Sequence, residues 1–193
     1  MERGSRVLVR IDCNTPLRPA AGSSAASSSP GTAGTPLEVS DDLRLTTVLP
    51  TIEWLRERGA AVVLCGHLGR PKGAPDPQYS LAPVAKRLSE LLGTDVALAP
   101  TAVGPAAADR IASLEAGDVM LLENLRFERG ETDNSPGFAV SLCEPVDAYV
   151  NEAFGASHRA HASIVGPPPI LPSAAGFSGT GGVSCSRRRT TGA

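Results

Sequence analysis

The stretch Ala60-Ala61-Val62-Val63-Leu64-Cys65 is a continuous apolar run. A short run of this kind, without alternating polar residues, is typical of a parallel strand that is buried on both faces. The same interpretation applies to residues 6–11, 118–122 and 147–150, and more weakly to residues 95–99. The sequence therefore predicts a sheet of parallel strands.

Segments with helical spacing separate these runs. In the first of them, Val48, Ile52 and Leu55 recur at the intervals that give a helix one apolar face. The predicted helices run from Thr46 or Thr47 to Gly59, from Ser80 to Gly93, over 105–115, and onward from Ser135 and Pro136. Because strand and helix alternate, the predicted fold class is α/β, a doubly wound, Rossmann-like parallel sheet with helices on both faces.

The composition fits one globular domain. The 193 residues are 41% apolar and 20% charged, and the net charge of −2 gives no general attraction to nucleic acid or to anionic membranes. No apolar run approaches the ~18 residues that cross a bilayer. The N-terminus also lacks the apolar stretch of a signal peptide. We therefore expect a cytoplasmic protein that binds neither nucleic acid nor membrane.

The cysteines and histidines do not form a metal-binding pattern. The four cysteines contain no C-x-x-C pair. His158 and His161 have the spacing of two ligands, but no third ligand stands near them in the sequence. We therefore expect reduced thiols, with Cys65 as a small buried apolar residue, and no metal site.

Two segments lack the composition of a packed structure. Residues 18–36 are mainly Ala, Ser, Gly, Thr and Pro, and we expect a flexible low-complexity insertion there. Residues 178–193 have no periodicity and contain many glycines and arginines, so we expect a disordered, aberrant tail. The predicted domain therefore covers residues 1–177.

Basic side chains follow the predicted strands. His67, Arg70, Arg126 and Arg159 each come after such a strand, and Arg44 belongs to a separate Asp-x-Arg element. In an open α/β sheet, ligands bind outside the carboxyl ends of the strands. Guanidinium groups at that edge can hold phosphate and carboxylate through paired hydrogen bonds. The pattern predicts a site for a small, multiply charged anion.

Two further polar residues, Asp12 and Asn14, follow the first predicted strand. Alternate residues of an extended segment share a face, so both could hydrogen-bond a substrate hydroxyl. The alternative is an Asx turn ahead of Pro16. The sequence leaves both interpretations open.

The basic residues have structural alternatives as well. Arg126 could form a surface ion pair with Glu123 or Glu128, and His67 could be a structural hydrogen-bonding histidine. A lone arginine after a strand is more often a solvated loop residue. Several arginines on one edge, however, repel one another unless an anion neutralises them, which favours a binding site.

Taken together, five segments of the chain resemble the 3-phosphoglycerate kinase family. They are VLVRIDCNTPL at 7–17, HLGRPKG at 67–73, LENLRF at 122–127, VNEAFGASHRAHAS at 150–163 and LPSAAGF at 171–177. The motifs occur in the order of the family and are specific in combination. They cover only the N-terminal, substrate-binding half of such enzymes.

The resemblance implies a role for each candidate residue. Asp12 and Asn14 would bind the hydroxyl and carboxylate side of the glycerate. Arg44 would contact the carboxylate and act catalytically by stabilising the phosphoryl group in flight. The non-transferring 3-phosphate would be held by His67, Arg70, Arg126 and Arg159.

The implied activity is phosphoglycerate kinase, a phosphotransferase with a carboxyl group as acceptor. It transfers a phosphoryl group reversibly between ATP, with Mg²⁺ on the nucleotide, and 3-phosphoglycerate, giving 1,3-bisphosphoglycerate in glycolysis and gluconeogenesis. The nucleotide-binding C-terminal domain of the family has no counterpart in the quoted motifs. We therefore expect a monomeric single N-terminal domain of a normally two-domain kinase, which binds 3-phosphoglycerate but is inactive alone. A non-catalytic phospho-acid binding module and a fragment without function are the alternatives.

The chain also departs from the family pattern at a few positions. The family usually carries Phe at Cys13, Val at Thr15 and Asp at Glu152. The low-complexity insertion stands where the family has a short connection. Both ends of the insertion can still reach the site if it loops out, because longer loops cost little extra entropy.

Overall fold

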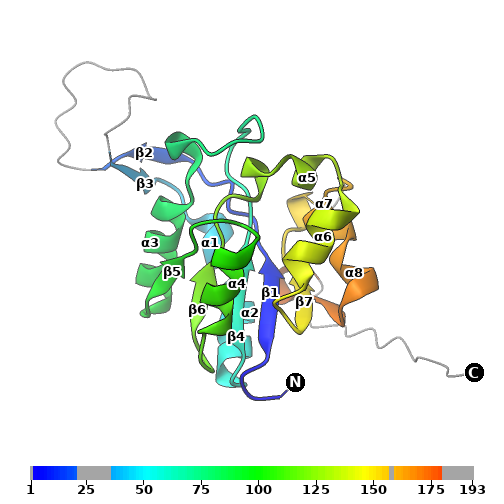
Figure 1. Cartoon of the computed structure of the whole chain (residues 1–193). Coiled ribbons are helices and arrows are strands. Elements are labelled where there is room, and N and C mark those ends of the chain that lie inside the picture. Colours follow the sequence, from blue (N-terminus) through cyan, green and yellow to red (C-terminus); the bar gives the residue numbers. More distant parts are fainter. Residues whose placement is uncertain (1, 21–35, 157–158, 180–193) are drawn as a thin grey trace, which may run out of the picture.

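The computed structural model describes residues 2–20, 36–156 and 159–179 (Figure 1). Within these residues, six parallel strands form one sheet in the order β5-β6-β4-β1-β7-β8. The strands are β1 (Arg6–Arg10), β4 (Ala61–Cys65), β5 (Val96–Leu98), β6 (Val119–Leu121), β7 (Ala148–Asn151) and β8 (Ser173–Ala175). The predicted parallel sheet is confirmed, and β8 is an edge strand that the apolar pattern did not predict.

Helices cover both faces of this sheet. They include α2 (Leu49–Glu57), α3 (Ala82–Leu92), α4 (Pro105–Ala112) and α6 (Pro136–Cys143). Val62 and Leu64 of β4 belong to the same apolar cluster as α2 and α3. Val63 and Cys65 belong to the cluster that contains α4 and α6. Since neighbouring residues of a strand point to opposite faces, the doubly wound arrangement is confirmed.

Shorter elements connect these units and were not predicted. The short α-helices are α1 (Leu43–Thr46), α5 (Arg129–Thr132), α7 (Ala162–Val165) and α8 (Pro167–Ile170). Single 3₁₀ turns are η1 (Pro77–Tyr79), η2 (Leu125–Phe127), η3 (Phe154–Ala156) and η4 (Phe177–Gly179). Most of them lie in the loops after the strands, where a periodic apolar pattern is absent.

Two long helices begin later than their predicted caps. Helix α2 has Val48 as its N-cap, because the hydroxyls of Thr46 and Thr47 bond to backbone carbonyls of α1, both at 2.9 Å. Helix α3 has Leu81 as its N-cap, and the Ser80 hydroxyl donates to a carboxylate of a neighbouring loop at 2.8 Å. The Thr46 and Thr47 hydroxyls are therefore bonded to α1, whereas Ser80 Oγ also accepts from the N–H of Ala82, the first residue of α3, at 3.2 Å.

The other predicted helix limits agree more closely. Gly93 ends α3 in the left-handed region with φ 61°. Ser135 caps α6, and its hydroxyl accepts a hydrogen bond from the Phe138 N–H at 3.4 Å. Helix α4 ends at Ala112 rather than at residue 115.

A two-stranded antiparallel hairpin occupies both ends of the predicted insertion at 18–36. Strand β2 (Leu17–Pro19) pairs with β3 (Leu37–Val39), and the Ala20 N–H donates to the Pro36 carbonyl at 2.8 Å. The backbone on either side of the insertion is therefore paired, which narrows the segment predicted to be flexible. Residues 21–35 lie outside the described part of the chain, as do residues 180–193 of the predicted tail.

A buried carboxylate attaches the segment after β8 to helix α2. Glu152, 4% exposed, accepts hydrogen bonds from the Thr51 hydroxyl and, at 3.3 Å, from the Ser178 N–H. The Phe177 N–H donates to the Thr51 hydroxyl at 3.1 Å. A Cβ atom at Gly176 would overlap the Glu152 carboxylate, so this close approach requires glycine.

Aromatic contacts reinforce the same junction. The rings of Trp54 and Phe177 meet edge to face, with centroids 6.0 Å apart and planes at 78°. The Cζ atom of the Arg58 guanidinium lies 3.8 Å from the centroid of the Trp54 ring. The segment after β8 is therefore held against α2 by both polar and aromatic contacts.

The cysteines of the described chain are buried free thiols. Burial raises the pKa of Cys13 to about 12 and that of Cys143 to about 11, and it also raises the pKa of Cys65. Cys65 is 0% exposed within the core, as predicted for a small apolar residue. Among the described helices, none has the length and apolar character needed to cross a membrane.

Candidate anion-binding site

One cavity of about 220 Å³ lies at the carboxyl ends of the central strands. All of the predicted site residues line it, namely Asp12, Asn14, Arg44, His67, Arg70, Arg126 and Arg159. Gly69, Gly155 and His161 complete the lining. The fold therefore brings together every side chain that the sequence placed in the candidate site.

The strand order explains this convergence. Strands β6, β4, β1 and β7 are consecutive neighbours, and all run in the same direction. Loops that are far apart in sequence therefore leave the sheet at one edge, as in other open α/β sheets. Arg44 joins them from α1, which precedes α2.

The loop after β1 is both an Asx turn and part of the cavity. Asp12 Oδ1 accepts from the Asn14 N–H at 3.0 Å, and Asp12 Oδ2 forms an ion pair with Arg44. Asn14 Oδ1 accepts from the Gly69 N–H at 2.9 Å. The turn alternative is therefore realised, and it holds both side chains at the cavity.

Arg126 does not form the ion pair offered as its alternative. The Glu123 carboxylate instead accepts from the Leu81 N–H at 2.8 Å and the Ser80 hydroxyl at 2.8 Å, at the start of α3. Arg126 Nη1 donates to the Gly69 carbonyl at 2.7 Å. Among the residues that the structure describes, no group accepts a hydrogen bond from its buried Nε.

Positive charges dominate the electrostatics of the cavity. Burial lowers the pKa of Arg126, and the nearby guanidinium groups of Arg159 and Arg10 lower it further. Burial also lowers the pKa of His161, despite the Glu131 carboxylate 3.8 Å away. A bound anion would relieve the repulsion among the arginines.

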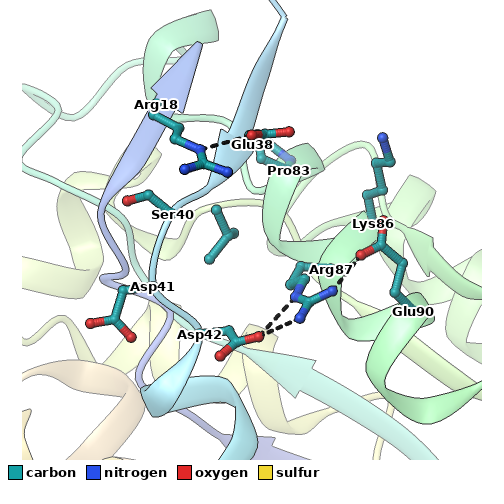
Figure 2. Close-up of a pocket in the computed structure, with 10 residues that line it drawn as sticks. Arg18, Glu38, Ser40, Asp41, Asp42, Pro83, Lys86, Arg87 and Glu90 are labelled. Atoms are coloured by element: carbon teal, nitrogen blue, oxygen red, sulfur yellow. Dashed lines mark hydrogen bonds and ion pairs between the residues drawn. The ribbon is translucent and has the colours of Figure 1, made fainter. Parts of the chain in front are cut away.

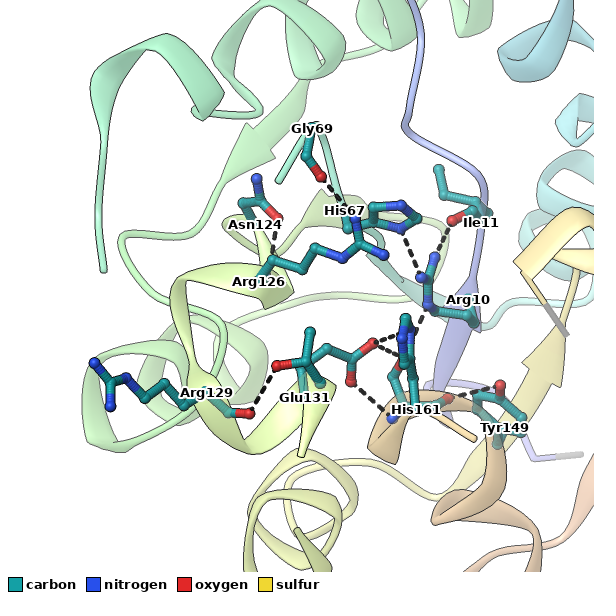
Figure 3. A network of polar contacts seen from close by, with 12 residues as sticks. Arg10, Ile11, His67, Gly69, Asn124, Arg126, Arg129, Glu131, Tyr149 and His161 are labelled. Carbon is teal, nitrogen blue, oxygen red and sulfur yellow. Dashed lines mark hydrogen bonds and ion pairs between the residues drawn. The ribbon is translucent and has the colours of Figure 1, made fainter. Parts of the chain in front are cut away.

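A buried polar network contacts His67, one of the residues that line the cavity (Figure 3). Arg10 is 0% exposed, and its Nη2 lies 3.0 Å from His67 Nδ1. Its Nε donates to the Ser163 hydroxyl at 2.9 Å, and that hydroxyl donates to Glu131 at 2.7 Å. The pKa of His67 falls to about 3, through burial and then through the charge of Arg10.

Sequence reasoning missed this network. Arg10 carries one signal, a charged residue within an otherwise apolar strand, because charged residues are almost never fully buried unless paired. Glu131 and Ser163 lie in segments without a recognisable pattern. The two-histidine metal alternative involves His158, which lies outside the described residues, whereas His161 lies in the cavity.

A second, larger cavity of about 620 Å³ lies between the β2–β3 hairpin and α3 (Figure 2). Both of its arginines form ion pairs with carboxylates of the lining. Arg18 lies 2.8 Å from Glu38, and Arg87 lies 2.5 Å from Asp42 and 2.6 Å from Glu90. We prefer the smaller cavity as the candidate site because its cations converge on one volume.

The chain matches known proteins over most of its length. The family model "Phosphoglycerate kinase" matches residues 2–181. The phosphoglycerate kinase of Rubrobacter xylanophilus is 51% identical over 175 residues, which are 91% of this chain and 40% of that protein. That of Thermosipho africanus is 45% identical, over 91% of this chain and 39% of that protein.

Solved structures show the same relationship. The crystal structure of phosphoglycerate kinase from Pyrococcus horikoshii matches with a TM-score of 0.74 and 32% identity, over 91% of this chain and 40% of that one. The enzyme from Coxiella burnetii matches with a TM-score of 0.70 and 32% identity, over 90% of this chain and 39% of that one. This chain spans about 40% of the length of the curated relatives it matches. It belongs to the phosphoglycerate kinase family.

Proposed function

We propose that this chain is the substrate-binding N-terminal domain of a phosphoglycerate kinase and binds 3-phosphoglycerate in the 220 Å³ cavity. One observation carries the proposal. The residues to which the family resemblance assigns contacts with 3-phosphoglycerate all line this single cavity. We propose residues 1–177 as the domain.

The cavity has complementary groups for each end of the proposed substrate. His67, Arg70, Arg126 and Arg159 supply donors for a phosphate, and guanidinium groups suit its geometry. Arg44, whose side chain is 52% exposed, can contact the carboxylate while it remains beside Asp12. Asp12 and Asn14 are then the partners of the substrate hydroxyl.

The proposed reaction is the reversible transfer of a phosphoryl group from Mg²⁺-ATP to the carboxylate of 3-phosphoglycerate. Such transfer depends mainly on positioning and on stabilisation of charge. Arg44 fits this role because it is the exposed cation at the carboxylate end. The phosphoryl transfer is proposed for the whole protein, since the chain spans about 40% of its relatives.

Calorimetry with the 193-residue chain tests the binding proposal. Titration with 3-phosphoglycerate is expected to give saturable heat with one site per chain. Glycerate, which lacks the phosphate, and glycerol 3-phosphate, which lacks the carboxylate, are expected to bind more weakly. No saturable heat from 3-phosphoglycerate, in a sample that unfolds cooperatively, would refute the proposal.

The second candidate is a binding module for phospho-acids without phosphoryl transfer. It is favoured by the cavity, whose cationic and polar groups can bind a phosphate and a carboxylate without taking part in phosphoryl transfer. A coupled assay for ATP-dependent formation of 1,3-bisphosphoglycerate tests the second candidate. Robust turnover by the 193-residue chain excludes the module, whereas binding without turnover is expected from both candidates, because the transfer is proposed for the whole protein.

A further inference from the structure

The last residue of β1 is a fully buried arginine. Arg10 is 0% exposed, and each nitrogen of its guanidinium group has a defined partner (Figure 3). Nε donates to the Ser163 hydroxyl at 2.9 Å, Nη1 donates to the Ile11 carbonyl, and Nη2 lies 3.0 Å from His67 Nδ1. A buried charge with this many contacts has one orientation available.

The contact between Arg10 and His67 determines which ring nitrogen of His67 carries the proton. A guanidinium group has donors and no acceptor, so His67 Nδ1 must accept the hydrogen bond from Arg10. A nitrogen that accepts carries no proton, and the proton of the neutral ring then resides on Nε2. A doubly protonated ring would place an N–H against the N–H of Arg10 and two positive charges in contact.

Glu131 fixes the orientation of Arg10 through one hydroxyl group. Ser163 accepts from Arg10 Nε and donates to Glu131 Oε1 at 2.7 Å, while its own N–H donates to Glu131 Oε2 at 2.9 Å. The Tyr149 hydroxyl donates to the Ser163 carbonyl at 2.8 Å. Both Arg10 and Glu131 are 0% exposed, so rotation of Arg10 would leave a buried charge unpaired.

The other basic groups around His67 also oppose its protonation. Arg126 from η2, Arg159 after β7 and His161 before α7 all disfavour a second proton on the ring. Together with burial and Arg10, they lower the pKa of His67 to about 3. The geometry and the surrounding charges therefore agree on a neutral ring at neutral pH.

We propose that Arg10 is a positioning residue that holds His67 as the neutral Nε2–H tautomer, ready to donate one hydrogen bond to the phosphate of the substrate. The hydrogen bond to the phosphate rests on the proposed function. The tautomer of His67 is a property of the ligand-free protein alone. His67 lines the cavity, and Nε2 is the ring nitrogen that Arg10 leaves for a ligand.

The arrangement has a consequence for the pH dependence of binding. A neutral N–H donor contributes a hydrogen bond without adding a charge that varies with pH. The affinity for a phospho-acid would then vary with pH through the ionisation of the ligand, because the arginines stay charged. Without Arg10, His67 could adopt the other tautomer or become cationic in weak acid.

Nitrogen NMR of the imidazole rings tests the proposed tautomer of His67 directly. The chain has three histidines, so the signals of His67 can be assigned by their loss in His67→Gln. In the ligand-free wild type we expect an unprotonated Nδ1, a protonated Nε2 and no titration between pH 5 and 8. A protonated Nδ1, or a midpoint within this range, would overturn the inference whether or not 3-phosphoglycerate binds.

Variants test the dependence on Arg10. Arg10→Met would remove the guanidinium that reaches the buried Glu131 carboxylate through the Ser163 hydroxyl, so the double variant Arg10→Met/Glu131→Gln is used as well. Either variant is expected to raise the pKa of His67 and to let the ring adopt the Nδ1–H tautomer, and Arg10→Lys, which retains a donor, is expected to restore the wild-type tautomer in part. Unchanged His67 signals in a folded double variant would overturn the role of Arg10.

A matched control separates positioning from loss of stability. Arg6 lies at the other end of β1, where it donates to the Ile111 carbonyl at 3.1 Å and the Ala112 carbonyl at 3.0 Å. Arg6→Met removes these structural bonds and is expected to leave the His67 tautomer unchanged. In calorimetry at pH 8, the double variant is expected to bind 3-phosphoglycerate about tenfold more weakly, as for one lost charge-assisted hydrogen bond, with the deficit shrinking toward pH 6.

If calorimetry shows no binding while the wild-type tautomer is as expected, the proposed function fails and the assignment of Arg10 stands. If binding occurs but shows the same pH profile in wild type and double variant, the link between tautomer and substrate is overturned.

Discussion

Gly69 connects three loops of the cavity through its backbone. Its N–H donates to Asn14 Oδ1 at 2.9 Å, and its carbonyl accepts from Arg126 Nη1 at 2.7 Å. Its φ of 62° lies in the left-handed region, and a Cβ atom there would overlap the Tyr79 ring. The residue is therefore required by both its conformation and its close approach.

Gly69→Ala is expected to destabilise the domain by more than the left-handed conformation alone, which costs about 1–2 kcal/mol, because the Tyr79 ring must move. Denaturant unfolding measures the change. Gly93→Ala is the matched control, since Gly93 has φ 61° and open space around the position of a Cβ. Equal losses in the two variants would contradict the close approach at Gly69.

Arg126→Ala is expected to weaken binding of 3-phosphoglycerate by about 1.5–3 kcal/mol, the value of a hydrogen bond to a charged group. Calorimetry of the two proteins gives the difference. Arg18→Ala, in the larger cavity, is the control and should leave the affinity unchanged. An unaltered affinity in Arg126→Ala would remove Arg126 from the site.

At this scale, the sequence predicted the residues that line the cavity but missed those that support them. His67 or Arg126 could be found because each follows an apolar run, and parallel strands end at one edge. Glu131 could not, because its contact with Ser163 joins two short helices whose packing no periodicity encodes. The sequence therefore did not predict that Arg10 is linked to Glu131 through Ser163.

Among the elements, the strands with continuous apolar runs were predicted and the edge strand was missed. Strand β4 is entirely buried, which gives it the uninterrupted run at 61–65. Strand β8 is Ser173-Ala174-Ala175, whose residues are only partly buried, and such small residues carry no strand signal. Its place is determined by pairing with β7 and by the junction at Glu152.

One hydroxyl group, that of Thr51, links helix α2 to the segment after β8. Thr51 is 2% exposed, donates to Glu152 and accepts from the Phe177 N–H. Thr51→Val keeps the shape but removes the hydrogen bonds to Glu152 Oε1 and from the Phe177 N–H, with an expected loss of about 1–3 kcal/mol in the free energy of unfolding. Urea unfolding measures it.

Thr47→Val is the matched control for this prediction. The Thr47 hydroxyl donates to the Arg44 carbonyl at the exposed start of the same region. Removing it is expected to change stability by less than about 0.5 kcal/mol. A loss of similar size in both variants would show that the buried junction contributes nothing special.

For the molecule as a whole, the buried histidines predict a loss of stability in acid. The pKa of His67 falls from its ordinary value of 6.5 to about 3, and that of His161 is also lowered. Below pH 6.5, His67 takes up a proton in the unfolded chain but not in the native chain. The stability that is present above pH 6.5 is therefore lost as the pH falls toward 3. At pH 5 the contribution of His67 to this loss is about 2 kcal/mol.

Chemical denaturation at pH 7.5 and pH 5 checks this prediction. His67→Gln cannot take up the proton and is expected to show a smaller decrease between the two pH values. The decrease that remains in this variant includes His161. An equal decrease in wild type and variant would contradict a neutral His67 in the native state.

The edge-to-face contact between Trp54 and Phe177 has an optical consequence. Trp54 is the single tryptophan of the chain, so tryptophan emission comes from one ring in contact with the segment after β8. The ring belongs to α2, away from the residues that line the cavity. A change in emission when ligand is added would therefore report a change in the contact between α2 and the segment after β8.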